Sequence, residues 1–199
     1  MNPLCAQRAV ARTISALFSP PLAAGGMSIL LISRVTAPPV HRVGWLGIAL
    51  LFVTCLPMLY VGVLVARKKV DGFYISERSS RLMPLLVSSS SCLAGFVLLR
   101  ATGAPPPLSA FLLSYVVLGL VAAATNARWK ISLHGAGVCG PLAMLHHLLG
   151  LSTAYWLPVP LAVSWARMAL GAHSFPQIAA GCGIGFVVVW VVTAMYLSH

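Results

Sequence analysis

Acidic residues are almost absent from this chain, since Asp71 and Glu77 are the only two. All charged residues together make up 8% of the sequence, whereas soluble globular proteins carry roughly 25%. So few charges cannot cover a water-soluble surface, which excludes a soluble globular domain. Because both carboxylates lie in one segment, a metal cluster held by several carboxylates is also excluded.

Cysteine spacing of the kind that binds zinc is missing too. The five cysteines, at positions 5, 55, 92, 139 and 182, contain no CxxC pair and no disulfide framework. Three of them lie deep in apolar runs, where a cysteine acts as a small hydrophobic side chain. We therefore expect no metal and no cofactor.

Long apolar runs fill most of the chain, which is 59% hydrophobic. A helix needs about 20 apolar residues to cross the bilayer core, and helices pair every backbone polar group within the lipid. We therefore predict an all-α, polytopic membrane helical bundle of six to seven transmembrane helices, folded as a single domain over residues 1–199. The predicted spans are residues 17–35, 44–66, 82–99, 108–125, 135–149, 154–170 and 176–197.

Residues 1–43 form an N-terminal lead-in and a first span that differs from the others. Arg8 and Arg12 precede the apolar residues there, but no clean apolar core is followed by a small-residue cleavage site. We therefore expect an interfacial segment rather than a cleaved signal peptide. Pro20 and Pro21 interrupt the first span near its start.

Three polar loops follow the second, fourth and sixth predicted spans, at residues 67–81, 126–134 and 167–173. Because two spans separate each loop from the next, all three should emerge on the same membrane face, whether or not the first span crosses. Seven basic or histidine side chains then share this face. They are Arg78, Arg81, Arg128, Lys130, His134, Arg167 and His173.

The second and third of these loops have the same design, with basic residues, a histidine and then the start of a helix. Free N–H groups at a helix N-terminus bind anions, and Lys and Arg add charge and donors for phosphate oxygens. A histidine beside a bound phosphate can act as nucleophile or acid near neutral pH. Together with the net charge of +11, the pattern favours anionic lipid headgroups or a phosphate-bearing substrate over nucleic acid.

At these positions the chain resembles the type 2 phosphatidic acid phosphatase superfamily. Ser132-x-His134 in the second loop is similar to the Pro-Ser-Gly-His pattern of that family. Arg167-x5-His173 in the third loop has the spacing of its Ser-Arg-x5-His-x3-Asp pattern. The resemblance extends over about Asp71 to Gly185 and implies a family-like helical core over residues 71–197.

This resemblance implies a metal-independent hydrolase that cleaves a lipid phosphate or diphosphate, of the phosphatidate type or of the polyprenyl and dolichyl type. In the family the last histidine attacks phosphorus and forms a phosphohistidine, so His173 is the implied nucleophile. His134 is then the general acid that protonates the leaving oxygen. Arg167 is implied to clamp the phosphate, and Ser132 to donate a hydrogen bond to it.

The chain departs from the family patterns at four places. Leu133 stands for the glycine and Ile131 for the proline of the second pattern, and Ala166 replaces the serine of the third. Gln177 occupies the place of the aspartate that orients the nucleophilic histidine, as it does in the dolichyl-diphosphatase-like and glucose-6-phosphatase-like branches. Two roles are open to Gln177, which are orienting His173 and completing a capping box at the start of the last span.

The first pattern of the family, Lys-x6-Arg-Pro, is matched only loosely by the first loop. Arg78 and Arg81 lie near Pro84 without a lysine at the family spacing. We take Arg81 as the phosphate ligand and Arg78 as its rival. Lys130 is close in sequence to Ser132 and can supply the missing positive charge. Other basic residues at span ends, such as Arg67, are expected to anchor helices at the interface.

We therefore predict a membrane lipid phosphatase that works through a phosphohistidine. The departures also leave open a catalytically inactive membrane scaffold or lipid-binding protein, and a small-molecule transporter is a further alternative. We expect a multi-pass protein of a bacterial cytoplasmic membrane or an organellar membrane. The functional face carries ten of the thirteen Lys and Arg residues, so the positive-inside tendency places it in the cytoplasm.

Overall fold

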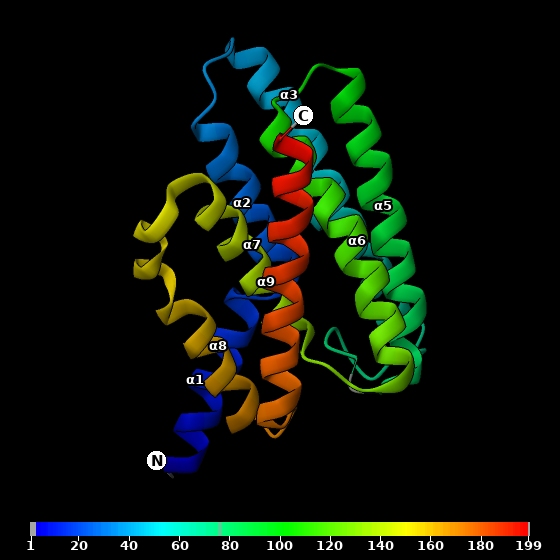
Figure 1. Cartoon of the computed structure of the whole chain (residues 1–199). Coiled ribbons are helices and arrows are strands. Elements are labelled where there is room, and N and C mark those ends of the chain that lie inside the picture. The colour runs from blue at the N-terminus through cyan, green and yellow to red at the C-terminus, as the bar shows by residue number, and fades with distance from the viewer. Residues whose placement is uncertain (1–2, 76, 199) are drawn as a thin grey trace.

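The computed structural model describes residues 3–75 and 77–198, and the regular elements within these residues are all helices, with no β-strand (Figure 1). Four continuous helices are long and apolar enough to cross a membrane, and a bent helix pair near the N-terminus makes a possible fifth. The all-α architecture is thus confirmed, while the six to seven spans stay a prediction. The four helices cover Pro39–Ala66, Ser79–Ala101, Pro106–Arg128 and Phe175–Leu197.

The bent pair consists of α1 (Pro3–Leu17) and α2 (Pro20–Ser33), which meet at an angle of 49°. Ser19 has an extended backbone with ψ of 149°, as is usual for a residue that precedes proline. Pro20 then begins α2, where a missing N–H costs no helical hydrogen bond. The proline pair therefore bends the predicted first span. The lead-in before it folds as a helix that packs against α8 (Pro158–Ala169).

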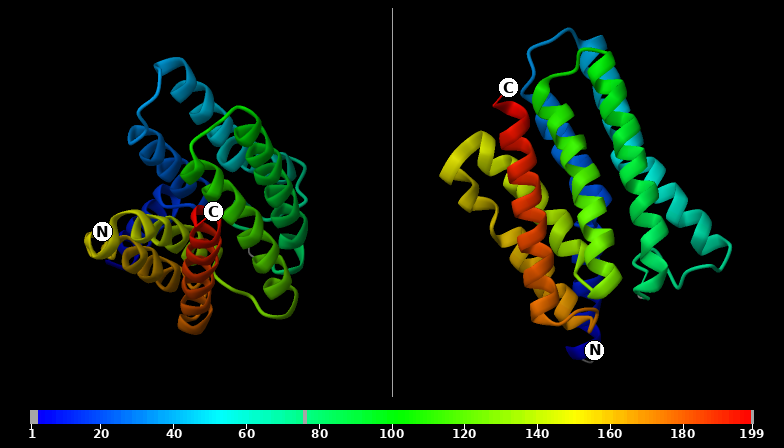
Figure 2. Two further views of the ribbon diagram at one scale, coloured as in Figure 1. Left: turned by 45° about the horizontal axis from the view of Figure 1, so that its top comes forward. Right: turned by 45° about the vertical axis from the view of Figure 1, so that its right-hand side comes forward.

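The next span is also irregular, although it runs without a break from Pro39 to Ala66. It comprises α3 (Pro39–Leu50), the π-turn η1 (Leu51–Cys55) and α4 (Leu56–Ala66). A π-turn is wider than an α-helical turn, and Pro57 just after it has no N–H to donate. Beyond η1 the helix changes direction, and Figure 2 shows α4 diverging from α5 (Leu82–Ala101).

The buried core draws side chains from most of the helices, including two long helices and the C-terminal helix. Helix α5 packs along α6 (Pro106–Arg128), and α6 packs against α9 (Phe175–Leu197). Phe111 and Leu112 of α6 and Leu99 of α5 are fully buried in this core. These helices begin and end within a few residues of the predicted spans, because each starts at a proline or a polar loop.

The fifth and sixth predicted spans fold as a short hairpin. Helix α7 (Leu133–Leu149) rises from the loop end, the 3₁₀ segment η3 (Gly150–Trp156) turns, and α8 returns (Figure 1). Helices α7 and α8 have 17 and 12 residues, which is shorter than the roughly 20 that a crossing needs. The hairpin nevertheless keeps the parity of the loops, because it leaves and re-enters the same end of the molecule.

Helices α7 and α9 cross in direct backbone contact. A Cβ atom on Gly181 would meet the carbonyl oxygen of Ser132, and one on Gly185 would meet that of Ala136. Glycines four residues apart allow this close approach between membrane helices. The Ser132 N–H also donates to the carbonyl oxygen of Gln177 at 3.0 Å. The first turns of α7 and α9 are therefore held side by side.

Candidate functional site

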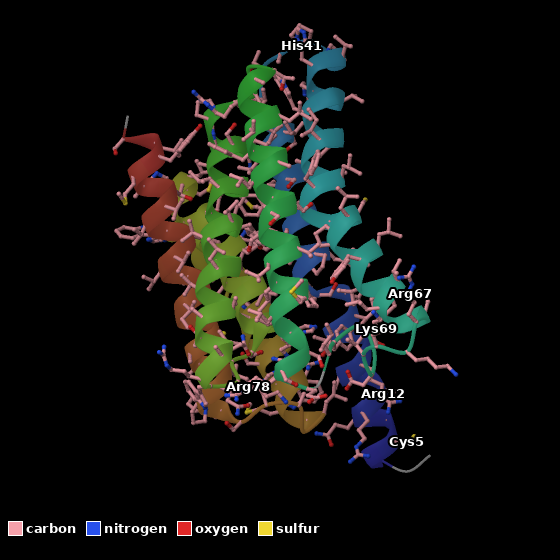
Figure 3. All side chains as sticks on the ribbon, turned by 90° about the vertical axis from the view of Figure 1, so that its right-hand side faces the viewer. Cys5, Arg12, His41, Arg67, Lys69 and Arg78 are labelled. Atoms are coloured by element: carbon pink, nitrogen blue, oxygen red, sulfur yellow. The ribbon has the colours of Figure 1, made fainter. Side chains whose placement is uncertain are left out.

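The three polar loops meet at one end of the bundle. Arg81 from the first loop donates through Nη1 to the carbonyl oxygen of Ile131 in the second loop at 3.2 Å. The second and third loops are joined by the backbone bond between Ser132 and Gln177. Figure 3 shows the exposed basic side chains at this end and His41 at the opposite end, with Arg12, Arg67, Lys69 and Arg78 labelled.

His173 lies just before α9 and is only 8% exposed. Its Nδ1 is 3.1 Å from Oε1 of Gln177, and the same oxygen accepts the Ser174 N–H at 3.3 Å. An atom that accepts a backbone N–H must be the amide oxygen, so His173 donates its Nδ1–H to it. The other ring nitrogen, Nε2, therefore keeps a free lone pair. Gln177 fills both of the roles that the sequence left open.

The surroundings of His173 keep its ring neutral. Burial is the largest cause that lowers the pKa of His173, to about 4. Three nearby positive charges lower this pKa further, while the hydrogen bond to Gln177 acts in the opposite direction. The three charges belong to Arg81, Arg167 and Lys130. At neutral pH the imidazole is thus an uncharged base surrounded by cations.

His134 lies in the first turn of α7 and is 5% exposed. Its Nε2 is 3.2 Å from the carbonyl oxygen of Ser15 in α1. This oxygen is free because the bend diverts its helical partner, Ser19, whose N–H bonds to Ala16 instead. The carbonyl acceptor fixes an Nε2–H on His134 and directs Nδ1 away from α1. The bend between α1 and α2 thus positions His134, which is 119 residues away in the sequence.

Tyr74 connects His134 with Arg167. The Tyr74 ring lies edge-on to the His134 ring at 4.9 Å between centroids. The guanidinium carbon of Arg167 is 5.5 Å from the centroid of the same Tyr74 ring, within the range of a cation–π contact. Tyr74 therefore places the third-loop cation beside the second-loop histidine.

Arg81 and Arg167 are buried cations, 3% and 5% exposed. Arg81 is held by the carbonyl oxygens of Ile75, at 2.8 Å from Nε, and Ile131. The Nε atom of Arg167 is buried without a hydrogen-bond partner among the residues that the structure describes. A buried donor without an acceptor is costly, and a bound anion would supply one.

Lys130 and Ser132 complete this cluster. The pKa of Lys130 is lowered mainly by burial and further by the charges of Arg81 and Arg167, whereas Asp71 acts to raise it. Ser132 is fully buried and accepts the Gly135 N–H at 3.2 Å as the N-cap of α7. A hydroxyl that accepts in this way keeps its own hydrogen for another acceptor.

Arg78 lies outside the cluster. It is exposed, and its Nη1 donates to the carbonyl oxygen of Arg128, which is exposed as well. The two candidate phosphate ligands of the first loop therefore lie apart, with Arg81 buried among the other cations and Arg78 on the outer surface. The expected phosphate-binding role of Arg78 does not fit this position, because its guanidinium holds a loop carbonyl instead.

Two contributors were missed by the sequence reasoning. Tyr74 belongs to a loop that parity had already placed at this end, but no spacing marks it. Ser15 acts through its main chain, which no side-chain motif can indicate, although Pro20 and Pro21 did predict the break that frees its carbonyl. His146, by contrast, lies outside this cluster, where its Nδ1 is 3.2 Å from Oγ1 of Thr153.

The cluster is therefore made of cations, imidazoles and hydroxyls. Within residues 3–75 and 77–198, no group of three or more His, Cys, Asp or Glu side chains is placed to hold a metal ion. Its donors suit an oxyanion such as a phosphoryl group. Comparison of the chain with models of known protein families, with curated proteins and with solved structures gave no match.

Proposed function

We propose that this protein is a membrane lipid phosphatase, which hydrolyses a lipid phosphate or diphosphate through a phosphohistidine intermediate. The observation that carries the proposal is the neutral His173 with its Nδ1 bonded to Gln177 and its Nε2 free, surrounded by buried cations. An imidazole in this state is a nucleophile, and the cations match the charge on a phosphoryl group. The resemblance to the type 2 phosphatidic acid phosphatase superfamily supports the same chemistry.

In the first step the Nε2 lone pair of His173 attacks phosphorus. The bond from phosphorus to the lipid oxygen breaks, and its electron pair stays with that oxygen. Protonated His134 gives its Nδ1 proton to the leaving oxygen, while its Nε2–H remains bonded to Ser15. Arg167 and Arg81 stabilise the charge on the equatorial oxygens.

In the second step a water molecule displaces His173 from phosphorus. Nδ1 of His134 takes a proton from the water molecule, the water oxygen attacks phosphorus, and the P–N bond to His173 breaks. Inorganic phosphate leaves, and both histidines return to their starting states. One residue thus serves as acid and then as base, as microscopic reversibility requires.

The proton on His134 depends on the substrate. Burial is the largest cause that lowers the pKa of His134, to about 3, and the charge of Arg167 lowers it next. A phosphoryl dianion bound beside Arg167 offsets that charge and raises the pKa of the imidazole. We therefore expect His134 to take up the proton that it later donates when the substrate binds.

The test is phosphate release by the purified protein with a chelator present. The substrate panel contains phosphatidate, phosphatidylglycerophosphate, and polyprenyl mono- and diphosphates. We expect release from at least one of them, with His173→Ala reducing kcat more than about 1000-fold and His134→Ala about 100-fold or more. Full activity in His173→Ala would refute the nucleophile.

The two arginines of the first loop provide a matched pair. Arg81→Gln should lower kcat/KM by about 100-fold, because a buried phosphate donor is lost. Arg78→Gln should stay within about twofold of the unchanged protein, since that guanidinium only holds a surface carbonyl. Equal losses in the two variants would contradict the placement of the phosphate beside Arg81.

A catalytically inactive scaffold or lipid-binding protein is the alternative. The same cations would hold an anionic headgroup without bond cleavage. Such a protein would bind a lipid phosphate and release no inorganic phosphate from any member of the panel. Trapping of a phosphorylated His173 in a rapid quench would exclude this alternative.

The proposal extends to the setting of the enzyme. It is a multi-pass protein of a bacterial cytoplasmic or organellar membrane, with a family-like core over residues 71–197 and the cation cluster on the cytoplasmic side. The apolar helices support membrane insertion, and the excess of Lys and Arg at the site end supports the orientation.

A further inference from the structure

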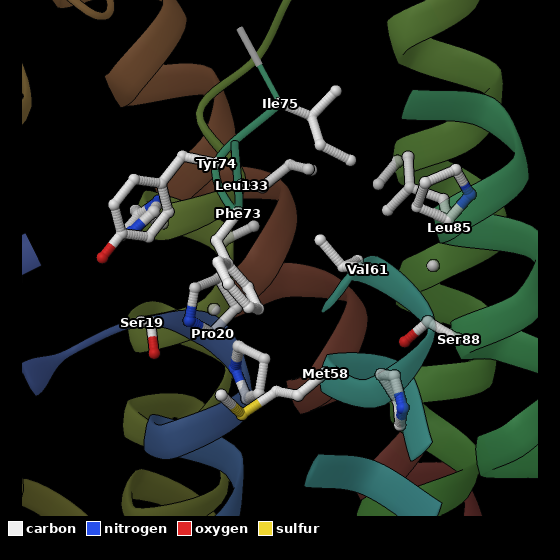
Figure 4. A pocket seen from close by; sticks show the side chains of 18 of the residues that line it. Ser19, Pro20, Met58, Val61, Phe73, Tyr74, Ile75, Leu85, Ser88 and Leu133 are labelled. Carbon is white, nitrogen blue, oxygen red and sulfur yellow. The ribbon is translucent and has the colours of Figure 1, made fainter. Parts of the chain in front are cut away.

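Directly beside the cation cluster lies an apolar cavity of about 440 Å³. Its walls come from α2, α4, α5, α6 and α7 and from the first loop. Figure 4 shows Met58, Val61, Phe73 and Ser88 around this space. Apolar side chains make most of the lining, and the polar ones include Arg81 and His134.

The cavity exists because two of the surrounding helices are irregular. Pro20 and Pro21 at the α1–α2 bend and Pro57 after η1 all line it. Thr54 joins the two irregular segments by donating to the carbonyl oxygen of Pro21 at 2.9 Å. The two bends that border the cavity are therefore joined by a hydrogen bond, so the backbone fixes the shape of the space.

Arg81 and His134 belong both to the cavity wall and to the cation cluster. A ligand that fills the cavity and reaches these two side chains must be apolar along its length and anionic at its end. Leu133 and Ile75 also line the cavity, so the apolar wall begins directly beside the cations. The space thus has the polarity of a hydrocarbon chain joined to a phosphoryl group.

We infer that this cavity binds a single hydrocarbon chain of the lipid phosphate while its phosphoryl group lies among Arg81, Arg167 and the two histidines. The inference rests on the proposed function and adds the site that recognises the chain. The cavity is one continuous space of about 440 Å³, so it takes one hydrocarbon chain, and the remainder of a longer chain extends beyond it. A second chain of a diacyl lipid would have to stay outside the cavity.

Two pairs of substitutions, one on α4 and one on α5, test whether the cavity binds the hydrocarbon chain. Val61→Trp fills the cavity from α4, and Val63→Trp places the same side chain on the exposed face of that helix. Ser88→Phe fills it from α5, with exposed Ser90→Phe as its control. The substrates are farnesyl phosphate, which carries one chain, and glycerol 3-phosphate, which carries none.

We expect Val61→Trp and Ser88→Phe to raise KM for farnesyl phosphate at least tenfold and to leave hydrolysis of glycerol 3-phosphate unchanged. The controls should alter neither substrate by more than twofold. Equal effects of Val61→Trp and Val63→Trp, or equal effects on both substrates, would overturn the inference while the phosphatase proposal stands.

A binding measurement separates the two proposals. Farnesyl phosphonate cannot be hydrolysed, and its affinity for the purified protein can be determined by calorimetry. Binding that Val61→Trp weakens tenfold supports the chain site even if no substrate is cleaved, in which case only the proposed hydrolysis fails. If the affinity for farnesyl phosphonate is the same in Val61→Trp, Ser88→Phe and the unchanged protein, the inferred chain site is wrong, whatever the activity.

Discussion

At the scale of single residues, several contacts set the tautomer and the charge of His173. Gln177 fixes its tautomer, burial removes its charge, and the surrounding cations favour the same neutral state. The spacing of Arg167 and His173 could be read from the sequence, because it reflects a fixed offset along the chain. The contact with Tyr74 could not, since it depends on how a loop folds over a helix that is distant in sequence.

Lys130 offers a way to test the electrostatics of His173 alone. Its charge lowers the pKa of His173, whereas the charges of Arg167 and Arg81 lower the pKa of both histidines. Lys130→Met should raise the pKa of His173 from about 4 toward its usual value. Protonation would then block the nucleophile at a higher pH, so the acid limb of kcat/KM moves upward. A pH–rate profile measures this shift.

The matched control is Lys69→Met, which removes an exposed charge at the same end of the molecule. Its acid limb should coincide with that of the unchanged protein. An unshifted limb in Lys130→Met would mean that His173 does not govern the profile.

At the scale of elements, the proline and glycine positions decide how the helices meet. The apolar runs predicted helices in the right places, because hydrophobic length is a local property of the chain. The π-turn in Leu51–Cys55 was not predicted, since nothing in its composition distinguishes it from an ordinary helix. The hairpin of α7 and α8 was predicted as two spans because both helices are apolar, and these two crossings stay a prediction.

The crossing of α7 and α9 predicts opposite results for two glycines of one helix. A Cβ on Gly181 would strike the backbone of Ser132, whereas one on Gly183 would meet open space. Gly181→Ala should therefore destabilise the fold by about 1–3 kcal/mol and lower kcat, because it pushes His173 away from Ser132. Gly183→Ala should be neutral or stabilise the helix by up to about 1 kcal/mol.

Thermal unfolding in detergent, together with phosphate release, distinguishes the two variants. If Gly181→Ala unfolds at the temperature of the unchanged protein and keeps full activity, the close backbone contact does not hold the site together.

At the scale of the whole molecule, the two ends differ in charge. The polar loops and most of the Lys and Arg residues lie at the site end (Figure 3). Counting pairs of spans along the sequence was enough to gather these loops, because a helical hairpin returns the chain to its starting end whether or not it crosses. The number of crossings could not be found in this way for the same reason.

This polarity predicts a labelling pattern. In a variant without the native cysteines, we expect His41→Cys to react with a membrane-impermeant maleimide applied to intact cells. Gly72→Cys, at the site end, should react only after the membrane is opened. Labelling of both from outside would refute the separation of the two ends, and the reverse pattern would refute only the cytoplasmic orientation.

The hydrogen bond between Ser15 and His134 joins positions 119 residues apart. Synthesis proceeds from the N-terminus, so α1 and α2 are complete long before α7 has been made. The carbonyl oxygen of Ser15 cannot contact His134 until the three long helices between them in the sequence have been synthesised. The contact between the first helix and the second polar loop can therefore form only after about two thirds of the chain has been synthesised.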